Sequence, residues 1–283
     1  IYDNKSDKFI RYWFNADADD PRHPQFPELR PQIYNHEAMP YEGCILGYFT
    51  VWQGPENNVC DSLNIQKRNE VLIGWSKDGF HWNRENKKPF LPVSEDFHAW
   101  NAGNVQSTAG SPLIVGDSLY FYVSGRYNSK PKHDSNFATG LAMLRRDGFV
   151  SMRAGRKEGY IEIKTQIPAN GNYLFVNADV KGTLAVEVLD DNGQPMEGFT
   201  KKDCISMKKS DKTKQMISWE KHPGVTSLVG KTVRLRFYLK QADIYAFWIS
   251  AWQTGESGGY TGGGGPGLSD EGIDTPMDKL KNN

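Results

Sequence analysis

Residues 72–82 read "LIGWSKDGFHW", an apolar run that leads into Asp78-Gly79 and ends on a tryptophan. Branched and aromatic residues in the run favour a β-strand over a helix. Asp-Gly directly after a strand is typical of the tight turn of a β-hairpin. The segment "RRDGFVSM" (145–152) repeats this pattern roughly 70 residues later, a spacing compatible with a long-looped blade of a β-propeller. Two unrelated hairpins are the alternative interpretation.

The same strand pattern extends over the rest of the chain, with no convincing amphipathic helix between the strands. It predicts an all-β protein. From residue 157 on, evenly spaced and alternating runs joined by short turns such as "VKGT" (180–183) predict an antiparallel β-sandwich over 157–253. Residues 254–283 are rich in Gly, Pro and charge, which predicts a flexible tail. Earlier strands are expected in "FIRYWF" (9–14), "CILGYFTVW" (44–52), "EVLIGWS" (70–76), "SLYFYVSG" (118–125) and "TGLAMLRR" (139–146).

Composition narrows the classes of partner. Lys and Arg number 34 and so do Asp and Glu, so nothing in the charge suggests nucleic acid or an acidic membrane surface. The apolar runs are too short to span a bilayer. The cysteines Cys44, Cys60 and Cys204 lack metal-ligand spacing, and no phosphate or dinucleotide loop is present, so we expect neither a metal nor a cofactor. Cys44 and Cys60 form a disulfide or remain thiols.

A series of motifs spans most of residues 9–252: "DDPRHP", "YNHEAMPYEGCILGYFTVWQGPEN", "LIGWSKDGFHW", "NVQSTAGSPLIVGDSLYFYVSGR" and, later, "VRLRFYLKQADIYAFWIS". As a series it resembles bacterial proteins that are similar to the N-terminal domain of glycoside hydrolase family 32. The resemblance implies a five-bladed β-propeller followed by a β-sandwich. It also implies a role in polysaccharide degradation outside the cytoplasm, in a secreted, periplasmic or cell-surface protein.

The propeller blades would occupy residues 1–156. At roughly 50 residues a blade this length gives about three blades, whereas propellers close with four to eight. An open ring would leave unpaired strand edges. The chain starts at Ile1 without an initiator Met. We therefore expect two further blades to precede it in a longer precursor.

The segment "NADADDPRHP" (15–24) concentrates three carboxylates, an arginine and a histidine around two prolines. Asn15, Asp17 and Asp19 fit the first ligand positions of an EF-hand. Asp20, however, stands where Gly is needed and Phe26 where Glu is needed, which excludes that motif. Two other interpretations of the segment are a calcium site of another geometry and a simple polar turn.

In family 32 an Arg-Asp-Pro motif supplies an Asp that stabilises the transition state. Here the order is Asp20-Pro21-Arg22, an inexact match. The resemblance makes Asp20 a candidate catalytic residue, with Arg22 lowering its pKa. Arg22 and His23 then become candidate sugar contacts. An Asp-Pro turn with surface charges is the alternative.

Glu42 lies in "MPYEGCILGY" (39–48), just before a strongly apolar strand. A carboxyl group there is partly desolvated, which raises its pKa as a general acid requires. Family 32 enzymes carry their acid in a Glu-Cys motif, and this chain has Glu-Gly-Cys. We interpret Glu42 as the candidate general acid, with Glu37 as its competitor and a hydrogen-bonded structural Glu as the alternative. The family nucleophile motif is absent, so the nucleophile lies in the missing blades or the chemistry differs.

Three further candidate substrate-binding residues come from later loops and strands. Trp100 suits stacking on a sugar ring, and Asn104 suits hydrogen bonds to sugar hydroxyls. Arg126 suits a carboxylated sugar, or an ion pair with a neighbouring Asp. The leading hypothesis is a glycoside hydrolase acting on a polysaccharide or oligosaccharide. A non-catalytic glycan-binding protein and a propeller polysaccharide lyase are the alternatives.

Overall fold

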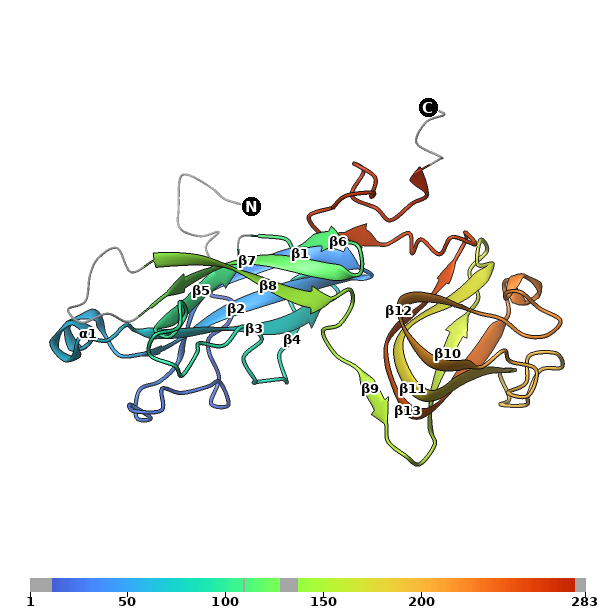
Figure 1. The fold of residues 1–283 in the computed structure, drawn as a ribbon, viewed down its shortest axis with the longest axis horizontal. Helices are drawn as coiled ribbons and strands as arrows, with labels where there is room; N and C mark the ends of the chain where they lie inside the picture. The colour runs from blue at the N-terminus through green and yellow to red at the C-terminus, as the bar shows by residue number, and fades with distance from the viewer. Residues whose placement is uncertain (1–11, 109, 128–136, 278–283) are drawn as a thin grey trace. The chain divides into compact units, whose positions relative to one another are not determined.

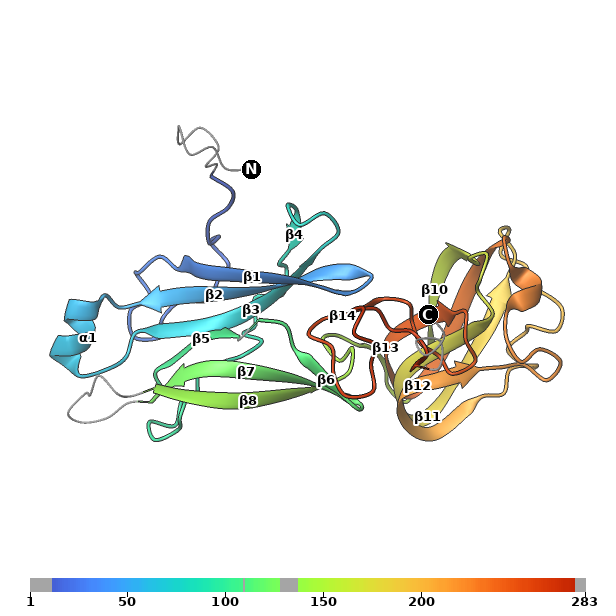
Figure 2. The ribbon, with the colours of Figure 1, turned by 90° about the horizontal axis from the view of Figure 1, so that it is seen from above.

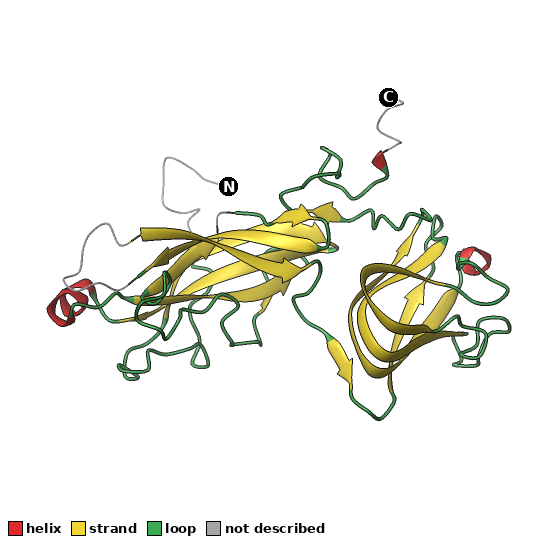
Figure 3. Cartoon of the chain, viewed as in Figure 1, coloured by secondary structure: helices red, strands yellow, loops and turns green. Residues whose placement is uncertain are grey.

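The structure is a computed structural model that describes residues 12–108, 110–127 and 137–277. It is nearly all-β, as the sequence predicts (Figure 3). Contacts divide the chain into two units. The first unit comprises Ile1–Pro40, Cys44–Ser111 and Phe121–Ala142, and the second comprises Tyr41–Gly43, Pro112–Tyr120 and Met143–Asn283. Helix α1 (Asn57–Leu63), like every other helix among the described residues, is too short to cross a membrane.

The first sheet is an antiparallel meander in the order β14-β1-β2-β3-β4. Its inward side chains Phe49, Val51 and Leu72 are completely buried, because they alternate with residues of the other face along β2 and β3. The strands are β1 (Gln32–Glu42), β2 (Cys44–Gly54), β3 (Arg68–Ser76), β4 (Trp82–Asn83) and β14 (Tyr260–Thr261).

The second sheet has β7 at its centre, with β5 and β6 on one side and β8 on the other. Phe121 of β7 contacts Tyr48 and Phe90, with ring centroids 5.9 and 5.5 Å apart, so this sheet packs against the first one. Figure 2 shows the strands of the two sheets beside each other. The strands are β5 (Asn104–Thr108), β6 (Leu113–Val115), β7 (Ser118–Arg126) and β8 (Phe137–Arg145).

The third sheet is a single, strongly curled half-barrel in the order β10-β13-β11-β12, with β9 also paired to β13 (Figure 1). Register shifts in β11, between Val176 and Ala178 and between Val180 and Thr183, bend the sheet around its own apolar core. The strands are β9 (Met152–Ala154), β10 (Gly159–Gln166), β11 (Tyr173–Leu189), β12 (Met207–Ile217) and β13 (Thr232–Ser250).

The structure bears on two expectations about architecture. The described residues show two sheets and a curled sheet, and a five-bladed propeller is not shown. The predicted sandwich over 157–253 is one curled sheet instead of two facing sheets. The reason is local: "VKGT" (180–183) is a bulge inside β11 and not a turn, so two expected strands are one.

Smaller segments also differ from expectation. Tyr12–Phe14 form no strand, and residues 9–11 of "FIRYWF" lie outside the described residues. Residues 254–277 belong to the segment that was expected to be a flexible tail. They contain β14, whose backbone pairs with that of Tyr41 and Glu42. Cys44 and Cys60 are thiols here, so the disulfide alternative is not formed.

Candidate functional site

The Asp-Gly turn between β3 and β4 is fixed by its own side chains. The Asp78 carboxylate accepts hydrogen bonds from the backbone N–H groups of Phe80 (2.9 Å) and His81 (2.8 Å). Ser76 Oγ accepts another from Gly79 N–H at 2.9 Å, and Gly79 has a φ of 77°, which glycine tolerates best. The turn therefore holds the aromatic residues around it in fixed positions.

Exposed aromatic side chains gather at this turn. Trp13, Trp75 and Phe80 are 46%, 48% and 69% exposed. Trp13 Nε1–H donates to Phe80 O at 3.0 Å, and Trp82 Nε1–H donates to Gly79 O at 3.2 Å. They line an open cleft of about 1380 Å³ whose walls come from residues 13–19 and 75–87 of the first unit. Solvent-exposed aromatic rings in a concave site are typical of ligand binding.

Ion pairs to the buried Asp20 form part of the cleft wall. Arg84 Nη2 donates to both carboxylate oxygens of Asp20, at 2.8 and 3.0 Å. Lys87 Nζ lies 3.2 Å from Asp20 Oδ1 and 2.5 Å from Asp17 Oδ2. Burial opposes ionisation of Asp17, but the hydrogen bond and charge of Lys87 lower its pKa overall. The Asp20 side chain is completely buried, so its observed role is to anchor this wall.

Arg22 and His23 contact the chain itself. The expected Arg22–Asp20 pair was wrong, because Arg22 Nη1 donates instead to Pro27 O (3.0 Å) and to Leu29 O (3.3 Å). His23 is buried against Phe26, and its Nδ1 accepts a hydrogen bond from Gln25 N–H at 3.1 Å. Burial lowers the pKa of His23, with Arg68 adding to the effect. Both residues therefore hold the loop that precedes β1.

Trp100, Asn104 and Arg126 form a separate group in the first unit. Trp100 is 40% exposed and covers Gly125 and Gly140, where a Cβ atom would come within 2.3 Å of its ring. Asn104 is completely buried, and its Nδ2–H donates to Lys67 O at 3.0 Å. The Arg126 guanidinium lies 4.4 Å from the ring centre of Phe137. Of the three, Trp100 presents its ring to solvent.

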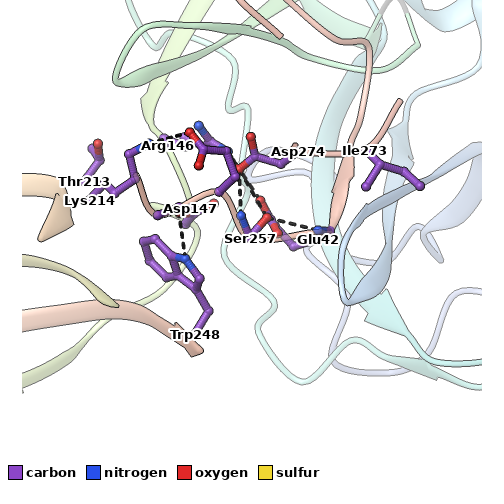
Figure 4. A network of polar contacts seen from close by, with 12 residues as sticks. Glu42, Arg146, Asp147, Thr213, Lys214, Trp248, Ser257, Ile273 and Asp274 are labelled. Atoms are coloured by element: carbon purple, nitrogen blue, oxygen red, sulfur yellow. Dashed lines mark hydrogen bonds and ion pairs between the residues drawn. The ribbon is translucent and has the colours of Figure 1, made fainter. Parts of the chain in front are cut away.

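Glu42 lies in a polar cluster of the second unit (Figure 4). Arg146 Nη2 lies 3.6 Å from Glu42 Oε1 and 3.0 Å from Asp274 Oδ2. Asp274 also accepts hydrogen bonds from the N–H (3.1 Å) and Oγ–H (3.3 Å) of Ser257. Asp147, from the second Asp-Gly turn, accepts a hydrogen bond from Tyr41 Oη–H at 2.6 Å.

The environment of Glu42 favours its protonated form. Burial raises the pKa of Glu42 to about 7, and the nearby charge of Asp147 contributes to the rise. A hydrogen bond from Ser257 and the charge of Arg146 oppose it. The side chain is 27% exposed. A carboxyl group that titrates near neutral pH can donate or accept a proton, which is the property that general acid catalysis needs.

The two candidate catalytic carboxylates do not share a site within either unit, because Asp20 belongs to the first and Glu42 to the second. The sequence predicted a β-hairpin at residues 72–82, and Trp13, Trp75 and Phe80 were not among its candidate site residues. The available signal was the crowding of aromatic residues on both sides of Asp78-Gly79. Within the described residues, no group of three or more His, Cys, Asp or Glu side chains is arranged to hold a metal ion.

Comparisons with known proteins give little further information. No family model matches this chain, and no curated protein matches it. Among solved structures it is similar to a protein of Parabacteroides distasonis named a "putative glycoside hydrolase", with 13% identity and a TM-score of 0.26. The match covers 59% of this chain and 53% of that one, so this chain spans about half of its length.

Proposed function

We propose that this protein binds a carbohydrate chain in the aromatic cleft between β3, β4 and residues 13–19. The observation that carries the proposal is the set of exposed rings, Trp13, Trp75 and Phe80, held in place by the Asp78 turn. Aromatic faces pack against the C–H groups of sugar rings, and the neighbouring polar groups hydrogen-bond hydroxyls. The family 32 resemblance of the sequence agrees with this function and with a location outside the cytoplasm.

The binding test compares two tryptophans of the first unit. Affinity electrophoresis against a panel of soluble polysaccharides should retard the wild-type protein in at least one gel. Trp75→Ala should weaken that retardation at least ~10-fold, equal to about 1.4 kcal/mol. Trp100→Ala is the matched control, because Trp100 is similarly exposed but lies outside the cleft lining. Loss of binding in Trp100→Ala alone would move the site to Trp100.

Hydrolysis of a glycan at Glu42, in the second unit, is the second candidate function, and the pKa of Glu42 near 7 favours it. In this function Glu42 is the general acid. The sheets of the first unit are the later blades of a propeller. Glu42→Gln should then reduce the release of reducing ends by at least ~10²-fold. Glu37→Gln is the matched control, since Glu37 already accepts hydrogen bonds from Thr108. Loss of activity in Glu37→Gln with full activity in Glu42→Gln would reassign the acid.

A further inference from the structure

The cationic side chains of the aromatic cleft decide which sugars it accepts. The lining contains Arg84, Lys87 and Lys77, which are the groups that would recognise a carboxylated or sulfated sugar. An anionic glycan needs such a cation to be available at the surface. The partners of these side chains therefore determine whether an acidic ligand is recognised.

Arg84 and Lys87 are engaged by carboxylates of the protein itself. Arg84 makes a bidentate contact with buried Asp20, and its guanidinium also lies 4.6 Å from the ring centre of Phe49. Lys87 bridges Asp20 and Asp17. Two cations thus face two carboxylates, and this group of four side chains has no net charge. Pulling either cation toward a ligand would leave buried Asp20 with one of its two cationic partners, which is unfavourable.

The other charged side chains of the lining are mostly acidic. The lining has three exposed carboxylates, those of Asp19, Asp78 and Glu85. Lys77 is the remaining cationic side chain among the lining residues. His81 Nδ1 lies 2.7 Å from Asp78 Oδ2, so the imidazole is directed to that carboxylate. The field at the cleft surface is therefore negative, and it repels a carboxylate or a sulfate.

We infer that the cleft selects uncharged glycans and excludes polyuronates and sulfated chains. This inference rests on the proposed carbohydrate-binding function. The exposed rings of Trp13, Trp75 and Phe80 supply the contact area for an uncharged sugar, and this contact needs no charged group. A uronate in the same place would meet the carboxylates of Asp19 and Glu85, and Lys77 offsets only part of their charge. Selection comes from the repulsive groups as much as from the aromatic ones.

The test measures affinity for neutral and acidic polymers side by side. Inulin, galactomannan and soluble starch are the neutral probes, and polygalacturonate and alginate are the acidic ones. At about pH 8, above the ordinary titration range of imidazole, a neutral probe should bind at least ~10-fold more tightly than either polyuronate. Its affinity should change less than about twofold between about 50 and about 500 mM salt, because no ion pair with the ligand is screened.

A charge-reversal variant makes the inference falsifiable. Asp19→Lys/Glu85→Lys should gain at least ~10-fold in polyuronate affinity at low salt while its affinity for the neutral probe stays the same. Glu197→Lys, an exposed change in the second unit, is the control and should gain nothing. If the wild type binds polyuronates as tightly as neutral glycans, the inference is overturned and carbohydrate binding stands. If no polymer binds, the proposed function itself fails.

Discussion

Asp20 shows how a residue that looks catalytic in the sequence can be structural in the fold. Its carboxylate has no exposed surface and is surrounded by Arg84, Lys87 and the backbone N–H of Asp17. The sequence places Asp20 directly before a proline but gives no indication that Arg84, 64 positions later, would be its partner. Ion pairs between distant segments depend on strand pairing, which local patterns do not specify.

Asp20→Asn should destabilise the first unit. Removing one member of a buried ion pair leaves the other charges without compensation and typically costs about 3–5 kcal/mol. Urea unfolding monitored by tryptophan fluorescence measures the loss. Asp19→Asn is the control, because Asp19 is exposed and a surface change usually stays within about 0.5 kcal/mol. A variant of wild-type stability that no longer binds glycan would instead place Asp20 in contact with the ligand.

Glu42 should make the stability of the protein depend on pH. Its pKa is 4.5 as an ordinary glutamate and about 7 in the folded chain, so folding favours the protonated form. The stabilising contribution is complete below about pH 4.5 and is lost as the pH rises through about 7. Glu42→Gln keeps the neutral shape, so it should lie within about 1 kcal/mol of wild type near pH 5 and exceed it by about 1–3 kcal/mol near pH 8.

Thermal unfolding of both proteins at the two pH values tests this prediction. The comparison near pH 5 serves as the internal control for packing effects of the amide. Equal stability at both pH values would mean that Glu42 is ionised in the fold at no cost.

The sequence supported a desolvated Glu42 from its place before an apolar strand. Its partners Arg146 and Asp274 come from distant segments and were not predictable.

At the scale of elements, the sequence predicted where strands lie more accurately than where they begin and end. The runs at 44–52, 70–76 and 118–125 lie within observed strands, and the run at 139–146 ends one residue beyond β8. β11 was divided in two, because a Gly in mid-strand resembles a turn when only the local pattern is considered. Strand pairing overrides that pattern: "VKGT" stays in the ladder between β12 and β13, where a bulge absorbs the extra residues.

The bulge in β11 should be intolerant of a side chain at Gly182. A Cβ atom there would lie 2.2 Å from the backbone O of Lys240, and a backbone atom cannot move aside as a side chain can. Gly182→Ala should therefore destabilise the curled sheet by about 1–3 kcal/mol. Gly155→Ala is the matched control, because a Cβ atom at Gly155 meets nothing within 4 Å. Equal melting temperatures for the two variants would contradict the bulge geometry.

At the scale of the whole molecule, composition and periodicity were sufficient to predict an all-β chain. They were also sufficient to predict that the strand pattern changes near residue 157. They were not sufficient for the architecture, because alternation along a strand shows that one face is buried but not what covers it. A sandwich and a curled sheet therefore share one sequence pattern. The same limit applies to residues 254–277, whose glycines suggested flexibility although backbone pairing with Tyr41 and Glu42 decides their structure.

The curled sheet contains its own core, which leads to a prediction about domain boundaries. Its fully buried side chains all lie between Ile167 and Ile244, and Ala154 of β9 packs against them. Beyond β13, Trp248 Nε1–H donates to Gly255 O at 3.0 Å, and Ser250 Oγ–H donates to Glu256 O at 2.7 Å. A fragment of residues 151–256 therefore retains the core and the contacts that close its end, and it should fold alone.

Circular dichroism and amide NMR dispersion of the fragment 151–256 should show a cooperative β-protein. The matched fragment, residues 157–256, starts where the sequence alone placed the boundary. It lacks β9, which pairs with Ala242–Ile244 and holds Asp243 through Arg153 Nε at 2.7 Å. The shorter fragment should melt at a lower temperature, because the edge of β13 and part of the core lose their cover. If both fragments melted together, β9 would contribute nothing and the boundary at 157 would hold.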